Sequence, residues 1–252
     1  MEQATVNACR ELFELAFGEG DRSFGDLLFA NYAPDCLRVI TDAGSLKSML
    51  FSIPYDLQTA SGRVQARYIY ALATMPDARG KGYAGELLRR EIARGVPLFL
   101  RPSSPSLFDF YARVGFLPFS PVVERGGNAC GGKADENGGE RVAFCALSPA
   151  EYLKSRRAFL TLPFAEPSER FLTVHRAYGS AIGDGERFAA LFERHGEGVF
   201  FKEWLGDVSL VPLVAAELGA ATYRFRTYGA DGTPFGVGVN CPADTAFLIA
   251  MD

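Results

Sequence analysis

Cysteine and histidine are scarce in this sequence of 252 residues, which holds five cysteines and two histidines. The cysteines are odd in number, lie far apart and form no CxxC pair, so they indicate neither a disulfide framework nor a zinc site. We therefore expect reduced thiols, no bound metal and a cytoplasmic location.

Long apolar runs and excess positive charge are also missing. No run approaches the roughly 18 apolar residues that a membrane span needs, and the first residues lack the basic segment of a secretory signal. The formal net charge is −4, which gives no general attraction to polyanions. We expect neither a nucleic-acid nor a membrane partner, and the sequence leaves the oligomeric state open.

The composition is that of a folded α/β protein, with 48% hydrophobic and 22% charged residues. The length favours two domains, predicted at residues 1–147 and 148–252. Glycine is abundant, and six of the 27 glycines fall in the segment 126–139. We expect this segment to be a surface loop at the tip of a long hairpin between strands at 116–123 and 141–147.

Hydrophobic periodicity and turn residues divide the chain into short helices and strands. In the first half we expect helices at 6–17, 23–32, 84–92 and 104–114 and strands at 37–40, 48–53, 68–74, 96–100 and 116–123. In the second half we expect helices at 151–160, 167–181 and 210–218 and strands at 188–193, 199–204, 222–227 and 247–251. The two orders are similar enough to suggest a weak internal duplication. The second half is thus an α+β domain that could be a degenerate copy of the first.

One segment indicates chemistry, because a strand ends at Met75-Pro76 and a glycine-rich turn then leads into an amphipathic helix. Unpaired N–H groups at a helix start favour an anion, and glycines let a diphosphate approach the backbone. Arg79 and Lys81 add positive charge. The residues Gly80 to Gly85 also fit the GxGxxG pattern of dinucleotide-binding proteins. The preceding strands, however, look antiparallel, and no acidic partner for the ribose follows at the usual distance.

The segment more closely resembles the acyl-coenzyme A site of the GNAT superfamily of N-acetyltransferases. Its signature [Q/R]-x-x-G-x-[G/A] is satisfied from Arg79 to Ala84, and the later family motif Y-x-x-x-G-F is present from Tyr111 to Phe116. The resemblance covers roughly residues 5 to 147. It implies a GNAT acyl-CoA N-acyltransferase fold with a mixed, mostly antiparallel sheet, followed by a second, smaller α+β domain.

The resemblance also implies roles for individual residues. Tyr111 would protonate the leaving thiolate of acetyl-CoA, the acyl donor, while an amine of a small molecule or peptide attacks the acyl carbon directly. The residues expected to bind the coenzyme are Leu72, Ala73, Thr74, Arg79, Gly80, Lys81, Gly82, Tyr83, Ala84, Gly85, Ser104 and Phe108.

The sequence departs from the family pattern at the general base. Members often carry a carboxylate in the strand before the signature, where this chain has Tyr70. The base could be Tyr70 through a water chain, Glu124, or Glu203, which we expect to face a cleft between the domains. The missing carboxylate keeps a second interpretation open, a non-catalytic protein that binds or senses acyl-CoA. A third interpretation is a nicotinamide-nucleotide enzyme.

Overall fold

The computed structural model describes residues 2–18, 22–129, 141–161, 163–175, 179–229, 231–242 and 244–249. Most of the predicted loop at 126–139 lies outside these residues. The helices and 3-10 turns are α1 (Gln3–Phe17), α2 (Arg22–Cys36), η1 (Pro76–Ala78), α3 (Tyr83–Ile92), η2 (Pro105–Leu107), α4 (Phe108–Ala112), α5 (Pro149–Phe159), α6 (Glu169–His175), η4 (Val208–Leu210) and α7 (Val211–Glu217).

The strands in the first half are β1 (Leu37–Asp42), β2 (Ser45–Thr59), β3 (Gly62–Thr74), β4 (Leu98–Leu100), β5 (Leu117–Asn128) and β6 (Cys145–Ala146). Those in the second half are β7 (Phe164–Pro167), β8 (Ser180–Gly183), β9 (Phe188–His195), β10 (Gly198–Gly206), β11 (Thr222–Tyr228) and β12 (Thr233–Val239). They form one sheet in the order β1-β2-β3-β4-β12-β5-β11-β10-β9-β8-β6, with β7 beside β2. The strand pairs β3–β4 and β10–β11 are parallel, as is the isolated bridge between Phe164 and Ala246, and the other strand pairs in the described part of the chain are antiparallel. The prediction of a mixed, mostly antiparallel sheet is confirmed.

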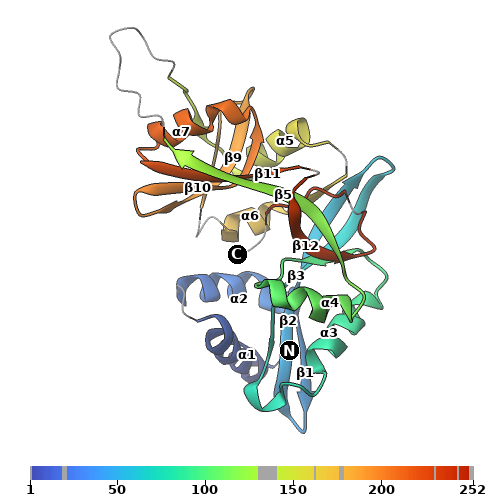
Figure 1. Ribbon diagram of the computed structural model, residues 1–252. Helices are drawn as coiled ribbons and strands as arrows, with labels where there is room; N and C mark the ends of the chain where they lie inside the picture. Colours follow the sequence, from blue (N-terminus) through green and yellow to red (C-terminus); the bar gives the residue numbers. More distant parts are fainter. Residues whose placement is uncertain are drawn as a thin grey trace.

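The two halves exchange strands at the centre of this sheet. β12, near the end of the chain, pairs with β4 and β5, while β5 continues into the second half and pairs with β11 (Figure 1). The order β1-β2-β3-β4-β12 is mirrored by β8-β9-β10-β11-β5 on the other side of the β12–β5 contact. A cut near residue 147 therefore does not separate two independent sheets.

Several predicted elements need correction. The hairpin across 126–139 does not form, because β5 pairs with β11 and β12 whereas β6 pairs with β8. The predicted helix at 167–181 ends at His175, and its last predicted residues belong to β8. Residues 247–249 are buried but form no strand, and the strands β7 and β12 were not predicted.

Helices cover both faces of the first half of the sheet. Along β2, Met49 and Phe51 pack in the same core cluster as α1 and α2, whereas Leu50 packs with α3 and α4. This alternation is the usual period of a strand, so the two helix pairs lie on opposite faces. No helix in the described part of the chain is long and apolar enough to cross a bilayer.

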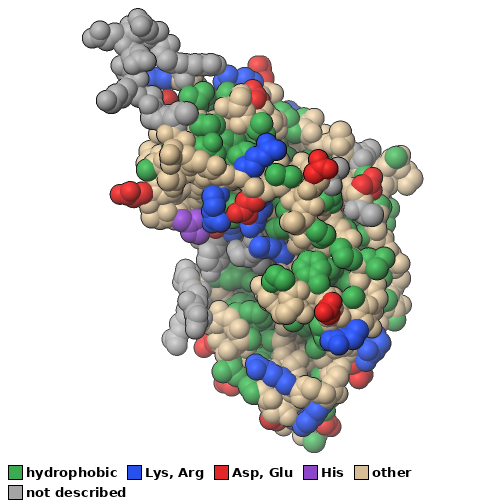
Figure 2. Space-filling model, viewed as in Figure 1, with side chains coloured by type: hydrophobic (Ala, Val, Ile, Leu, Met, Phe, Trp, Pro, Cys, Tyr) green, Lys and Arg blue, Asp and Glu red, His purple; other side chains and the backbone are tan. Residues whose placement is uncertain are grey.

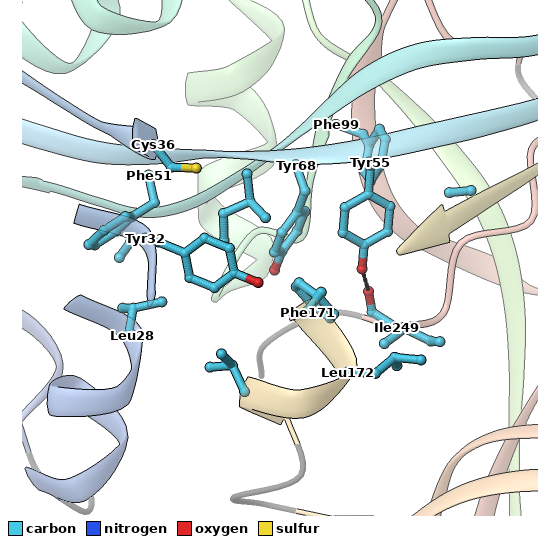
Figure 3. Close-up of a cluster of buried hydrophobic side chains, with 14 of the residues drawn as sticks. Leu28, Tyr32, Cys36, Phe51, Tyr55, Tyr68, Phe99, Phe171, Leu172 and Ile249 are labelled. Atoms are coloured by element: carbon cyan, nitrogen blue, oxygen red, sulfur yellow. Dashed lines mark hydrogen bonds between the residues drawn. The ribbon is translucent and has the colours of Figure 1, made fainter. Parts of the chain in front are cut away.

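Residues from the second half complete the core beneath α2. Figure 3 shows Phe171 and Leu172 of α6 and Ile249 facing Leu28, Tyr32, Tyr55 and Tyr68 of the first half. Tyr55 donates a hydrogen bond of 2.9 Å to the carbonyl of Ile249, and its ring lies 5.0 Å from that of Phe171. The two halves thus share one hydrophobic core as well as one sheet.

Candidate active site

A bulge in β3 lies at the centre of the candidate site. The register between β2 and β3 shifts, so that Ala71 and Leu72 of β3 stand opposite the single residue Leu50. Ala71 has a positive φ of 50°, the left-handed conformation that the first residue of a G1 bulge adopts. The bulge turns Tyr70 and Ala71 toward the core of α1 and α2, and Leu72 toward that of α3 and α4.

The parallel strands β3 and β4 separate directly after a short contact. They pair only at Arg67 with Leu98 and at Tyr68 with Phe99. Beyond this contact lies a cavity of about 400 Å³, lined by Phe17, Ile69, Tyr70, Ala71, Leu72, Leu100, Arg101, Pro102, Ser103, Leu107 and Tyr111. Because Phe17 belongs to α1 and Tyr111 to α4, side chains from both faces of the sheet reach this gap.

The structure brings three of the predicted site residues, Tyr70, Leu72 and Tyr111, together at this cavity. Tyr111 is 7% exposed, and burial raises the pKa of its hydroxyl to about 12. The phenol therefore stays protonated throughout the physiological pH range. Its hydroxyl makes no hydrogen bond within the described part of the chain, and this leaves it available to a bound molecule.

The glycine turn follows β3 on the side of α3. Gly82 is the N-cap of α3 and has a φ of 87°, while Gly80 has a φ of 73°. A Cβ atom added at either glycine would meet no other atom within 4 Å, so the space in front of both is open. No side chain caps the helix, and the first-turn N–H groups of Tyr83, Ala84 and Gly85 are free for an anion.

The charged residues of the turn lie at the surface. Arg79 and Lys81 are exposed, and the Arg79 Nε donates a hydrogen bond of 3.4 Å to the Thr74 carbonyl. The Tyr83 hydroxyl donates to Asp42 at 3.1 Å, so this side chain points toward β1. Ala73 is buried in the core of α1 and α2 and presents only its backbone to a ligand.

Ser104 and Phe108 do not line the cavity of Tyr111. They line a second cavity of about 260 Å³, together with Arg101, Pro102, Ser103, Pro105, Val122, Glu124, Arg226, Thr233, Pro234 and Phe235. The two cavities adjoin each other, because both are lined by Arg101, Pro102 and Ser103.

The structure does not bring Glu203 to Tyr111. Glu203 is fully buried in β10, where Arg156 of α5 contacts both its carboxylate oxygens, Nε at 2.7 Å and Nη2 at 3.0 Å. Tyr152 and Tyr228 also donate hydrogen bonds to it, at 2.7 and 3.2 Å. Burial alone would lower the pKa of Arg156, but the Glu203 carboxylate reverses this effect and raises it. Glu203 is thus a fully paired group that lines neither of the two cavities.

Two residues beside the cavities escaped the sequence analysis. Arg101 follows β4 directly, and Arg226 lies in β11, where it is only 8% exposed. The sequence contained one indication of Arg101, because it places this charged residue directly after a predicted buried strand. Their neighbourhood depends on the pairing of β5 with β11 and β12, which no local pattern encodes. Among the described residues, no group of three or more His, Cys, Asp and Glu side chains could hold a metal ion.

Comparisons with known proteins agree with this geometry. Residues 1–119 match the family described as an acetyltransferase (GNAT) domain. No curated protein matches the chain. Among solved structures, the chain is similar to a GCN5-related N-acetyltransferase from Kribbella flavida, with a TM-score of 0.69 and 12% identity over 94% of this chain and 70% of that one.

A GCN5-related N-acetyltransferase from Anabaena variabilis gives a TM-score of 0.70 and 14% identity over the same shares of the two chains. At such low identity the likeness concerns the fold, and it extends over both halves of this chain. The family match and the fold together confirm the predicted superfamily: residues 1–119 of this chain are a GNAT domain.

Proposed function

We propose that this protein transfers an acetyl or short acyl group from acyl-CoA to a primary amine of a small molecule or peptide. The observation that carries the proposal is the gap between β3 and β4, with Tyr111 lining its wall and an uncapped glycine turn at the end of β3. Together they offer a channel for a thioester, an anion site for its diphosphate and a proton donor.

The residues present fit acyl-CoA. Gly80 and Gly82 leave open space in front of the first turn of α3, whose free N–H groups and dipole suit a diphosphate. The backbone of Leu72, Ala73 and Thr74 continues from this turn to the cavity and would bind the pantetheine arm. Lys81 and Arg79 would add positive charge at the mouth.

When bound, acyl-CoA supplies an activated carbonyl and a thiolate leaving group. Tyr111 would hold a proton at its hydroxyl oxygen and donate it to the sulfur as the thiolate departs. The pKa of about 12 keeps the Tyr111 hydroxyl protonated until the thiolate departs. Tyr70, across the same cavity, would orient the amine and pass its proton to water.

The second half is best explained as a degenerate copy of the same fold. α5, β8, β9, β10, α7 and β11 repeat the order of their counterparts in the first half, and β10 and β11 are again parallel. Where the first half has its glycine turn, the second half has Asp207, whose carboxylate accepts a hydrogen bond of 2.9 Å from the backbone N–H of Ser209. A carboxylate at this place repels a diphosphate, so we assign acyl-CoA binding to the first half alone.

The test is the release of free thiol from acetyl-CoA with a panel of primary amines. We expect Tyr111→Phe to lower kcat about 100-fold, the lower range for a lost general acid, with acetyl-CoA binding unchanged. Tyr223→Phe, on β11 and away from both cavities, is the matched control and should keep full activity. Tight acetyl-CoA binding with no turnover on any amine would instead favour a binding or sensing protein.

A further inference from the structure

The cavity between β3 and β4 has two sides, and direct transfer requires it to hold the thioester and the amine at the same time. Leu72 and Tyr111 line it on the face of α3 and α4, the helix pair to which the glycine turn leads. Phe17, Tyr70 and Ala71 line it on the opposite face, with α1 and α2. The glycine turn assigns the first side to the coenzyme, which leaves the side of Phe17 and Tyr70 to the acceptor.

Phe17 is the outermost ring in a row of phenylalanines that begins in the core. The ring centroids of Phe51 in β2 and Phe29 in α2 are 5.1 Å apart, and that of Phe29 lies 5.8 Å from that of Phe13 in α1. The ring of Phe13 in turn lies 5.2 Å from that of Phe17. The first three rings are buried, whereas Phe17 is 42% exposed. The row thus supports Phe17 from one side and leaves apolar surface of its ring uncovered beside the cavity.

Tyr70 provides a second supported ring on the same side. Its ring stacks on that of Tyr68 at 6.1 Å with 23° between the planes, and Phe24 of α2 meets it edge-on at 6.3 Å. Ala71, the next residue, contributes only a methyl group. The described residues on the acceptor side are therefore two aromatic rings, each packed against other rings, and one small aliphatic side chain. Such a surface is stabilised when an apolar group covers it.

The exposure of Phe17 is unusual in this molecule. Phe17 is the only aromatic residue among the large apolar side chains that are exposed in the described part of the chain, and no other of them lines the cavity of Tyr111. Figure 2 shows further hydrophobic side chains at the surface around α4, the helix that supplies Tyr111 to the same cavity. Exposed apolar surface that continues into a cavity is typical of a ligand-binding site.

We propose that the acceptor is a primary amine with an apolar body, alkyl or aromatic, which packs on Phe17 and Tyr70 while its nitrogen reaches the acyl carbon. The proposal rests on the proposed function and adds the class of acceptor. Covering the Phe17 ring removes apolar surface from water, and only an acceptor with enough carbon can make this contact. An amine rich in hydroxyl groups would lose hydration against the same rings, so we expect it to be a poor acceptor.

Reaction products provide a test that does not require turnover. We would measure by calorimetry the binding of N-acetylhexylamine, N-acetyl-2-phenylethylamine and N-acetyl-2-(2-aminoethoxy)ethanol. The protein would be saturated with coenzyme A, so that only the acceptor side is open to them. The hexyl and aminoethoxyethanol chains have the same length, and the second has oxygen in place of carbon at two positions. We expect both apolar products to bind about tenfold tighter than the polar one.

Variants of α1 assign this preference to Phe17. Phe17→Ala should lower the ratio of apolar to polar binding to about twofold, because most of the contact is lost, and Phe17→Leu should keep most of the ratio. Leu15→Ala is the matched control, since Leu15 lies on the same helix, is 61% exposed and lines neither cavity. It should leave the ratio unchanged. Circular dichroism identical to that of the native protein would show that each variant is folded.

Equal binding of the apolar and polar products would overturn the proposal, and so would an effect of Leu15→Ala as large as that of Phe17→Ala. Loss of coenzyme A binding in a folded Phe17→Ala variant would also overturn it, because Phe17 would then lie on the coenzyme side.

Thiol release from acetyl-CoA with the three parent amines distinguishes this failure from that of the proposed function. If all three amines are acetylated equally well, only the acceptor class is wrong. If the apolar products bind more tightly but no amine is acetylated, the apolar site stands and the transferase proposal fails.

Discussion

Gly82 holds a backbone conformation that other residues adopt only at a cost. Its φ of 87° lies in the left-handed region, where a side chain costs about 1–2 kcal/mol. We expect Gly82→Ala to rotate the first turn of α3 and to weaken acetyl-CoA binding about tenfold, measured by calorimetry. Gly219, with a φ of 73° and open space around it, is the control. Gly219→Ala should cost similar stability and leave coenzyme binding unchanged, and equal losses of binding in both variants would contradict the role of Gly82.

The residues of the candidate site were predictable to different degrees. Tyr111 and the glycine turn lie in short motifs whose geometry depends on neighbours in the sequence. Tyr70 was predicted from its place in the strand, although the bulge that turns it was not. Arg226 could not be predicted, because its contact with Phe235 joins two strands only through their common neighbour β5. Glu203 was predicted to face a cleft. The residues next to it in the sequence do not reveal that Arg156 and two tyrosines from distant segments enclose its carboxylate.

At the scale of elements, the turn between β8 and β9 depends on one carboxylate. Asp184 accepts hydrogen bonds from the backbone N–H groups of residues 186, 187 and 188 and from the Arg187 side chain. Burial alone would raise the pKa of Asp184, but these bonds prevail and lower it to about 2. Because the folded-state value lies below the unfolded one of about 3.9, the stabilisation is complete above about pH 5 and is lost as the pH falls toward 2.

We therefore expect Asp184→Asn to reduce the melting temperature at pH 7, to reduce it about half as much at pH 3, and to have little effect at pH 2. Thermal unfolding of both proteins across this pH range would measure the difference. Asp244→Asn, at an exposed position in a turn, serves as the control. If the difference in melting temperature between the native protein and Asp184→Asn stays constant with pH, the charge of Asp184 does not contribute to stability.

The gap between β10 and β11 in the second half is filled rather than open. Like β3 and β4, these strands pair over part of their length only, residues 198–201 with 222–225, and β10 has a register shift before Glu203. Arg156 and Tyr152 enter from α5 and join Glu203 to Tyr228. The place that is a cavity in the first half is thus closed by a buried ion pair.

Removing one partner of this pair leaves the other charged and buried. We expect Glu203→Leu to lower the free energy of unfolding by about 3–5 kcal/mol, measured in urea. The double variant Arg156→Met/Glu203→Leu should recover most of this loss, because no uncompensated charge remains. Equal stability of the single variant and the native protein would show that the pair is not a determinant of stability.

The elements themselves were predicted unevenly. The amphipathic α3 and the capping box of α5, where Ser148 and Glu151 bond reciprocally, both follow from local sequence and are present. β12 escaped because Pro234 and two glycines interrupt its apolar residues. Residues 247–249 have the apolar character of a strand, but they contribute side chains to the shared core without joining a ladder.

At the scale of the whole molecule, the shared sheet predicts one cooperative unit. Trp204 is the only tryptophan, lies in the second half and stacks on Phe188 at 4.8 Å. Its fluorescence therefore reports unfolding at a distance from the coenzyme site. We expect acetyl-CoA at 100 times its Kd to raise the stability reported by Trp204 by about 2.7 kcal/mol. If the unfolding transition reported by Trp204 fluorescence is the same with and without acetyl-CoA, residues 1–147 and 148–252 unfold as separate domains.

The position of β12 also determines when the sheet can be completed during synthesis on the ribosome. Val239 lies opposite Leu98, so β4 lacks one neighbour until β12 has left the ribosome. Contacts between segments that are distant in the sequence form slowly. Until β12 pairs with it, β4 in the nascent first half is an unpaired edge strand. The first half therefore needs protection from premature pairing with other strands until β12 is available. Any product that stops short of β12 is expected to be insoluble rather than a smaller active enzyme.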